Sequence, residues 1–164
     1  MNRHTATTVP LDTVLEPALR LGLVDEATAE HVRHDVQVRR LDPVMALSMR
    51  GRVPSSAIYR AMAADRGVDF VSRDQMAPKR ELVGRMPTAL ARRRLVLPVR
   101  ETATEIVCAV GDLEALADDR LREALRHAFD KTPRLALADP AELRPAVEAA
   151  FAETAHAATV SVTE

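Results

Sequence analysis

The chain has 164 residues, of which 47% are hydrophobic and 29% are charged, and its formal net charge is -1 at pH 7. This length suits one domain or two small ones with a packed core, which excludes a chain that is disordered throughout. The near-zero net charge provides no global field for holding nucleic acid, and no apolar run reaches the ~18 residues of a membrane-spanning helix. The start of the chain lacks the hydrophobic stretch of a signal peptide. We therefore expect a soluble, cytoplasmic chain that does not insert directly into a membrane.

The core must be aliphatic, because aromatic residues make up only 2% of the chain and there is no Trp. This composition also disfavours aromatic platforms for stacking bases. The single cysteine, Cys108, excludes an internal disulfide and fits a reducing compartment. It lies in an apolar segment, where a thiol behaves as a small hydrophobic group and not as a nucleophile.

Two helical hairpins are predicted over residues 10–67, after a flexible tail at 1–9. In the first hairpin a helix over 10–21 stops at Gly22, and a second helix begins after Asp25. The second hairpin repeats this order 29 positions later, with Asp42 as the cap and Gly51 as the stop. A fourth helix then runs to Gly67. We interpret the glycines as left-handed helix stops.

A small α/β sandwich is predicted over residues 68–153, followed by a flexible tail at 154–164. Residues 95–99 and 105–110 read as a hairpin of two strands, and a helix over 112–129 crosses to a third strand at 135–137. A brief β-like run at 68–71 and a short helix at 79–86 precede them. A final helix is signalled by Asp139-Pro140-Ala141-Glu142. The fold class is therefore α+β, with four short helices followed by about three strands.

Six short segments follow one another in an order that is more specific than any one of them. They are Gly22-Leu23-Val24, Gly51-Arg52-Val53, Gly67-Val68-Asp69-Phe70-Val71, Met86 to Arg92 leading into Val96 to Val99, Ile106 to Asp112, and Leu135 to Ala138. In this order the chain, over residues 10–152, resembles the N-terminal domain of the traffic ATPases of type II secretion and type IV pilus assembly. The resemblance implies a domain that couples an ATPase to an inner-membrane platform protein, and that binds cyclic-di-GMP in some members.

ATP chemistry is not expected, because the sequence has no Gly-x-x-x-x-Gly-Lys-Ser/Thr loop for the nucleotide phosphates. We expect a stand-alone, non-enzymatic interaction module that binds or regulates a protein of a secretion or pilus apparatus. It has no expected cofactor, metal site or catalytic residue. The predicted partner-binding residues are Met49, Arg52, Ile58, Met62, Arg92, Arg93 and Arg94.

A cyclic-di-GMP sensor is the alternative that the resemblance implies. The family motif begins Arg-Leu-Gly eight residues before the turn glycine, where this chain has Val14 and Pro43. It ends in Gln, where this chain has Val36 and Asp65, and a carboxylate there would repel a phosphate. Neither copy of the motif fits, so we expect cyclic-di-GMP not to bind.

Two further alternatives start from charged residues. His31, His34 and Asp35 are neighbours on one helix and could share a metal ion, but an exposed, solvated helix face explains them better. The short helix pairs and the arginine content also permit a helix-turn-helix DNA binder, against which the near-neutral charge argues. We therefore expect no nucleic-acid partner.

Overall fold

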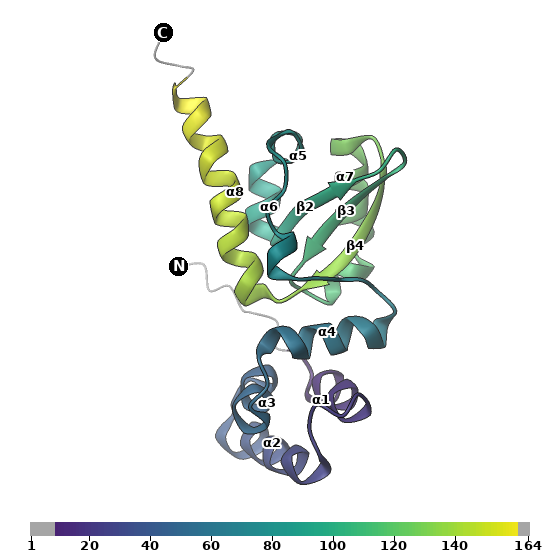
Figure 1. Cartoon of the computed structure of the whole chain (residues 1–164), viewed down its shortest axis with the longest axis vertical. Coiled ribbons are helices and arrows are strands. Elements are labelled where there is room, and N and C mark those ends of the chain that lie inside the picture. Colours follow the sequence, from purple (N-terminus) through teal and green to yellow (C-terminus); the bar gives the residue numbers. More distant parts are fainter. Residues whose placement is uncertain (1–8, 161–164) are drawn as a thin grey trace. The chain divides into compact units, whose positions relative to one another are not determined.

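The computed structural model describes residues 9–160, and the side chains of residues 9–152 (Figure 1). The chain divides into two compact units, one that ends at Arg66 and one that begins at Gly67. We call them the helical unit and the α/β unit. The remaining parts of the two predicted tails, residues 1–8 and 161–164, lie outside the described residues.

The helical unit contains the four short helices that the sequence predicts. They are α1 (Leu11–Arg20), α2 (Glu26–Arg39), α3 (Pro43–Gly51) and α4 (Ser55–Arg66). Carboxylates cap two of them as expected: Asp25 accepts a hydrogen bond from the backbone N–H of Thr28 at 2.8 Å, and Asp42 accepts one from that of Met45 at 3.1 Å. These bonds satisfy N–H groups that have no partner within the helix, and so they fix where α2 and α3 begin.

Gly51 has a different role from the one predicted. Gly22 and Gly67 take positive φ angles of 72° and 67°, as left-handed stops do, but Gly51 is the last helical residue of α3 and Arg52 takes the left-handed conformation at φ 52°. A Cβ at position 51 would lie only 2.6 Å from Cγ1 of Val24 and 2.8 Å from Cγ2 of Val53. Glycine is therefore required here by close packing and not by the backbone angle.

The α/β unit is built on one four-stranded sheet. Its elements are β1 (Phe70–Val71), η1 (Arg73–Gln75), α5 (Arg80–Arg85), α6 (Thr88–Arg94), β2 (Val96–Glu101), β3 (Glu105–Val110), η2 (Glu114–Ala117), α7 (Asp119–Phe129), β4 (Thr132–Ala138) and α8 (Pro140–Val160). The strand order is β1-β4-β3-β2, with β2 and β3 antiparallel and the other two pairs parallel. The predicted hairpin, crossover and α+β class are confirmed. The fourth strand is the short β-like run, which pairs with Leu137 and Ala138 at the end of β4.

Three helices in this unit differ from what the sequence predicts. The helix expected over 112–129 is divided at Asp118, because that side chain accepts hydrogen bonds from the backbone N–H groups of Arg120 and Leu121 and so starts α7. Helix α6 forms where no separate helix was predicted. Helix α8 continues to Val160, beyond the predicted end at residue 153, in an alanine-rich sequence that favours helix.

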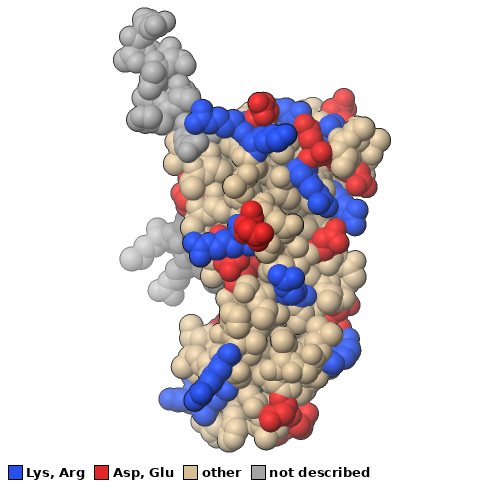
Figure 2. Space-filling model, in the orientation of Figure 1, with Lys and Arg blue, Asp and Glu red and all other residues tan. Residues whose placement is uncertain are grey.

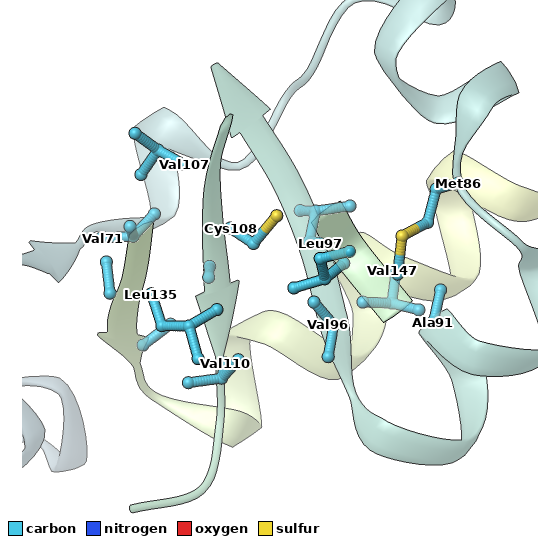
Figure 3. Close-up of a cluster of buried hydrophobic side chains, with 14 of the residues drawn as sticks. Val71, Met86, Ala91, Val96, Leu97, Val107, Cys108, Val110, Leu135 and Val147 are labelled. Atoms are coloured by element: carbon cyan, nitrogen blue, oxygen red, sulfur yellow. The ribbon is translucent and has the colours of Figure 1, made fainter. Parts of the chain in front are cut away.

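Helices cover both faces of β3. Neighbouring side chains of a strand point to opposite faces, and every residue from Ile106 to Val110 is buried. Helices α5, α6 and α8 contact β2, whereas α7 contacts β4. Figure 3 shows Cys108 of β3 among the aliphatic side chains of this core, which include Leu97 of β2. The sheet is thus an ordinary packed core.

Candidate interaction surfaces

An ion pair between α2 and α3 aligns the second and third helices. Arg50 donates two hydrogen bonds to the carboxylate of Asp35, from Nε at 2.6 Å and from Nη2 at 3.1 Å. The Asp35 side chain is only 3% exposed, and the bond from Arg50 lowers the pKa of this carboxyl below its ordinary value. A charge removed from water needs such a partner, so Asp35 and Arg50 hold one relative position of the two helices.

Large apolar side chains are exposed on the same two helices. Val38 is 65% exposed, Met45 53% and Met49 67%. Among the described residues, Leu21 is the one other large hydrophobic side chain with comparable exposure. Three of the four therefore lie on two consecutive helices.

Four arginines lie on or directly after the same two helices. Arg39 ends α2, Arg40 follows it, and Arg50 and Arg52 lie at the end of α3. We call Val38, Met45 and Met49, together with these four arginines, the α2–α3 surface. Figure 2 shows basic side chains at the edge of the helical unit where Figure 1 draws α2 and α3.

The structure separates the predicted partner-binding residues of the helical unit into two kinds. Met49 and Arg52 are exposed and lie on the α2–α3 surface. Ile58 and Met62 of α4 are 0% and 1% exposed, so the prediction that they contact a partner is corrected. Their spacing of four residues places both on the buried face of α4, where they pack as core residues.

The predicted arginine cluster lies in the α/β unit, at the carboxyl end of α6. Arg92 and Arg93 are exposed. Arg94 donates a hydrogen bond to Asp118 at 2.5 Å, which lowers the pKa of that carboxyl and joins the end of α6 to the cap of α7. Cations at a helix carboxyl end also interact favourably with its dipole, so this position has a structural explanation.

Sequence reasoning missed Val38, Met45 and Arg40. Met45 could have been found, because it lies four residues before Met49 and therefore on the same face of a helix. Val38 gives no comparable signal, since it follows a polar run near the end of α2. Its exposure depends on how α2 packs against its neighbours.

Neither the predicted histidine face nor Cys108 presents reactive chemistry. Asp35, which could have joined His31 in holding a metal ion, is bound to Arg50 instead. Within the part of the chain that the structure describes, no group of three or more His, Cys, Asp or Glu residues could hold a metal ion. Burial raises the pKa of the Cys108 thiol to about 12, which keeps it protonated at neutral pH.

The structure describes three of the positions compared with the cyclic-di-GMP motif as follows. Val14 and Pro43 are buried, and Asp65 forms an ion pair with Arg20. Among the described residues there is also no helix long and apolar enough to cross a membrane.

Comparison with known proteins gives one family and several related folds. The MshEN domain family matches residues 66–157. A solved structure described as MshE with cdg has a TM-score of 0.61 and 18% identity, over 82% of this chain and 96% of that chain. Two structures of the N-terminal domain of XpsE are 19% identical. One has a TM-score of 0.46 over 90% of this chain and 98% of that one, and the other 0.49 over 85% and 95%. A comparison with curated protein sequences finds no match.

Proposed function

The chain belongs to the MshEN domain family, and we propose that it is a non-catalytic, cytoplasmic module that docks onto a protein of a type II secretion or type IV pilus apparatus. The relationship to the N-terminal domains of secretion and pilus ATPases supports this class of machine. The observation that carries the docking role is the α2–α3 surface, because exposed Met and Val side chains accompanied by arginines are typical of a protein interface.

The residues present support binding better than catalysis. A traffic ATPase needs a glycine-rich loop with a Lys for the nucleotide phosphates, and this chain has neither that loop nor a substitute for it in its sequence. Its one thiol is buried and protonated. A module of this kind regulates by recruiting or competing for a partner that the ATPase also binds.

The direct test is binding of the full chain to the cytoplasmic parts of inner-membrane platform proteins from the secretion and pilus systems of the same organism. We expect one of them to bind, and we expect Met49→Ser to weaken the complex. Ile58→Asp is unsuitable for this test, because a carboxylate at a fully buried position would unfold the helical unit. Leu21→Ser is the matched control, since Leu21 is an exposed apolar residue outside the α2–α3 surface. The absence of binding by every platform protein would refute the proposal.

A cyclic-di-GMP sensor is the second candidate, and one observation favours it: the similar MshE structure is described as a complex with cdg. That observation conflicts with the sequence-based expectation that this chain does not bind the dinucleotide. At the four motif positions compared, the chain has Val14, Val36, Pro43 and Asp65, and none of these side chains offers a hydrogen-bond donor to a phosphate. Isothermal titration calorimetry of the full chain with cyclic-di-GMP decides between them. Saturable heat would establish the sensor, and its absence at high micromolar ligand would exclude it.

A further inference from the structure

We infer that the α2–α3 surface binds an acidic segment of a protein partner, one that carries aliphatic side chains between Asp or Glu residues. The inference deepens the proposed function, on which it rests, by assigning the docking surface and the chemistry of what docks there. Three features of the helical unit carry it: the placement of the apolar side chains, their identity and the charge around them.

The ion pair joins the stretches of α2 and α3 that carry the three apolar side chains. Helices α2 and α3 are connected by the three residues Arg40 to Asp42 and pack against each other. Asp35 lies level with Arg50. Val38 is one turn beyond Asp35, while Met49 directly precedes Arg50 and Met45 is one turn earlier. Val38 and the two methionines therefore lie within about two turns of the ion pair along their own helices.

The apolar residues are of a kind that suits binding. Methionine is flexible and polarisable, so two methionines adapt to the shape of a partner better than branched side chains do. The buried faces of both helices are already occupied by other residues, among them Val32 of α2 and Leu47 of α3, which are fully buried. The packing of the unit therefore does not use the side chains of Val38, Met45 and Met49.

The charge around them favours carboxylates. Of the two acids nearby, Asp35 is buried against Arg50, and Asp42 accepts the hydrogen bond that caps α3. Arg39 lies 3.8 Å from Asp35, and Arg40 and Arg52 form no ion pair with any residue that the structure describes. Arginine binds carboxylates through two parallel hydrogen bonds, which a lysine cannot form. In the sequence, the helical unit contains no lysine.

The surface disfavours the other possible occupants. A second copy of the chain, docked through the same surface by two-fold symmetry, would place these arginines opposite one another. Nucleic acid would meet three apolar side chains at the centre of the surface and no aromatic residue on which bases could stack. A protein segment with carboxylates around an aliphatic centre complements both the apolar side chains and the arginines of the α2–α3 surface.

The experiment uses a random peptide library displayed on phage and selected on the full chain. We expect the selected sequences to be enriched in Asp and Glu around Leu, Ile, Val or Met. A synthetic peptide from the selection is then titrated by fluorescence anisotropy. We expect the double variant Met45→Ser/Met49→Ser to lower its affinity at least about tenfold, and Arg40→Glu to lower it about fivefold, with a steep dependence on salt.

Matched controls separate the surface from general effects of sequence change. Leu21→Ser removes an exposed apolar side chain elsewhere in the helical unit, and Arg66→Glu makes the same charge change as Arg40→Glu at the end of α4. Both should bind the peptide as the unmodified chain does. All substituted side chains are exposed, and unchanged thermal unfolding will confirm that the variants fold.

Three outcomes would overturn the inference. They are selected peptides without acidic enrichment, controls that weaken binding as much as the α2–α3 variants do, and a concentration-dependent dimer that the double methionine variant dissociates. The proposed function is tested independently of this inference. If a platform protein binds but ignores the α2–α3 variants, the surface is wrong and the function stands. If acidic peptides bind as expected but no platform protein does, the surface stands and the function is wrong.

Discussion

Replacing Gly51 by alanine tests whether close packing, and not backbone freedom, requires glycine at the end of α3. The added Cβ would lie 2.6 Å from Val24 Cγ1, which is about 0.8 Å inside the 3.4 Å at which ordinary contact begins, and 2.8 Å from Val53 Cγ2. Both neighbours are β-branched and resist rotation about χ1, so they cannot turn away at low cost. Gly51→Ala therefore forces the end of α3 away from its neighbours.

The magnitude follows from two opposing effects. Overpacking of this kind costs about 1–3 kcal/mol, whereas alanine gains up to about 1 kcal/mol over glycine within a helix. We expect a net loss of about 1 kcal/mol in the free energy of unfolding, which lowers the melting temperature of a unit this small by about 5 °C. If Gly51 were instead a left-handed stop, alanine would be strained at that φ angle irrespective of Val24.

The chain has a natural probe for this measurement. Tyr59 of α4 is its one tyrosine, and there is no tryptophan, so tyrosine fluorescence reports unfolding of the helical unit alone. Urea unfolding of Gly51→Ala, Val24→Ala and the double variant gives the coupling between the two positions. We expect the double variant to be more stable than the sum of the single changes predicts. Additive effects, or a Gly51→Ala variant as stable as the unmodified chain, would refute the packing argument.

Three further predictions use the same probe or the single thiol. Ile58→Ala should lower the free energy of unfolding by about 2–5 kcal/mol because it leaves a cavity, while Met49→Ala should change it by less than about 0.5 kcal/mol; similar losses for both would contradict the burial of Ile58. The pKa of Asp35 is lowered in the folded chain, so its ion pair with Arg50 contributes fully above an unfolded pKa of about 3.9 and is lost as pH falls through the lower folded value. Urea unfolding measured from neutral to acid pH should therefore show a smaller loss of stability in acid for Asp35→Asn than for the unmodified chain. An equal loss would show that Asp35 does not contribute to the acid sensitivity. The buried thiol of Cys108, with its pKa raised to about 12, should react with a thiol reagent only when the α/β unit opens, and rapid labelling without denaturant would disprove this.

The sequence predicted those parts of the fold whose signals are local. Asp25 and Asp42 mark helix starts because their carboxylates meet backbone N–H groups three residues on, and that spacing is visible in the sequence. The β2–β3 hairpin was predictable from two apolar runs with a short polar connection. The role of Gly51 was not, because it depends on Val24, which is distant along the chain and approaches only after folding.

The candidate site was harder to predict than the fold. Ile58 and Met62 share one face of α4, and the sequence cannot say whether an apolar face is covered by the rest of the protein or left for a partner. Met49 is the same type of residue as Met62, but its side chain stays exposed, since Leu47 and Ala46 fill the buried face of α3. The distinction needs the packing of the unit as a whole.

The arginines of the α2–α3 surface differ from the arginine cluster at Arg92 to Arg94 in what surrounds them. In the α/β unit, Arg94 is engaged by Asp118, and acids also partner the basic residues around the sheet, since Glu101 pairs with both Arg85 and Lys131. On the α2–α3 surface Asp35 is paired with Arg50 and Asp42 caps α3, while Arg40 and Arg52 form no ion pair with any described residue and are exposed. A partner with carboxylates gains most where the cations are unpaired and adjoin apolar area. Charge reversal should therefore weaken partner binding at Arg40 more than at Arg92, and the opposite order would move the docking surface to the α/β unit.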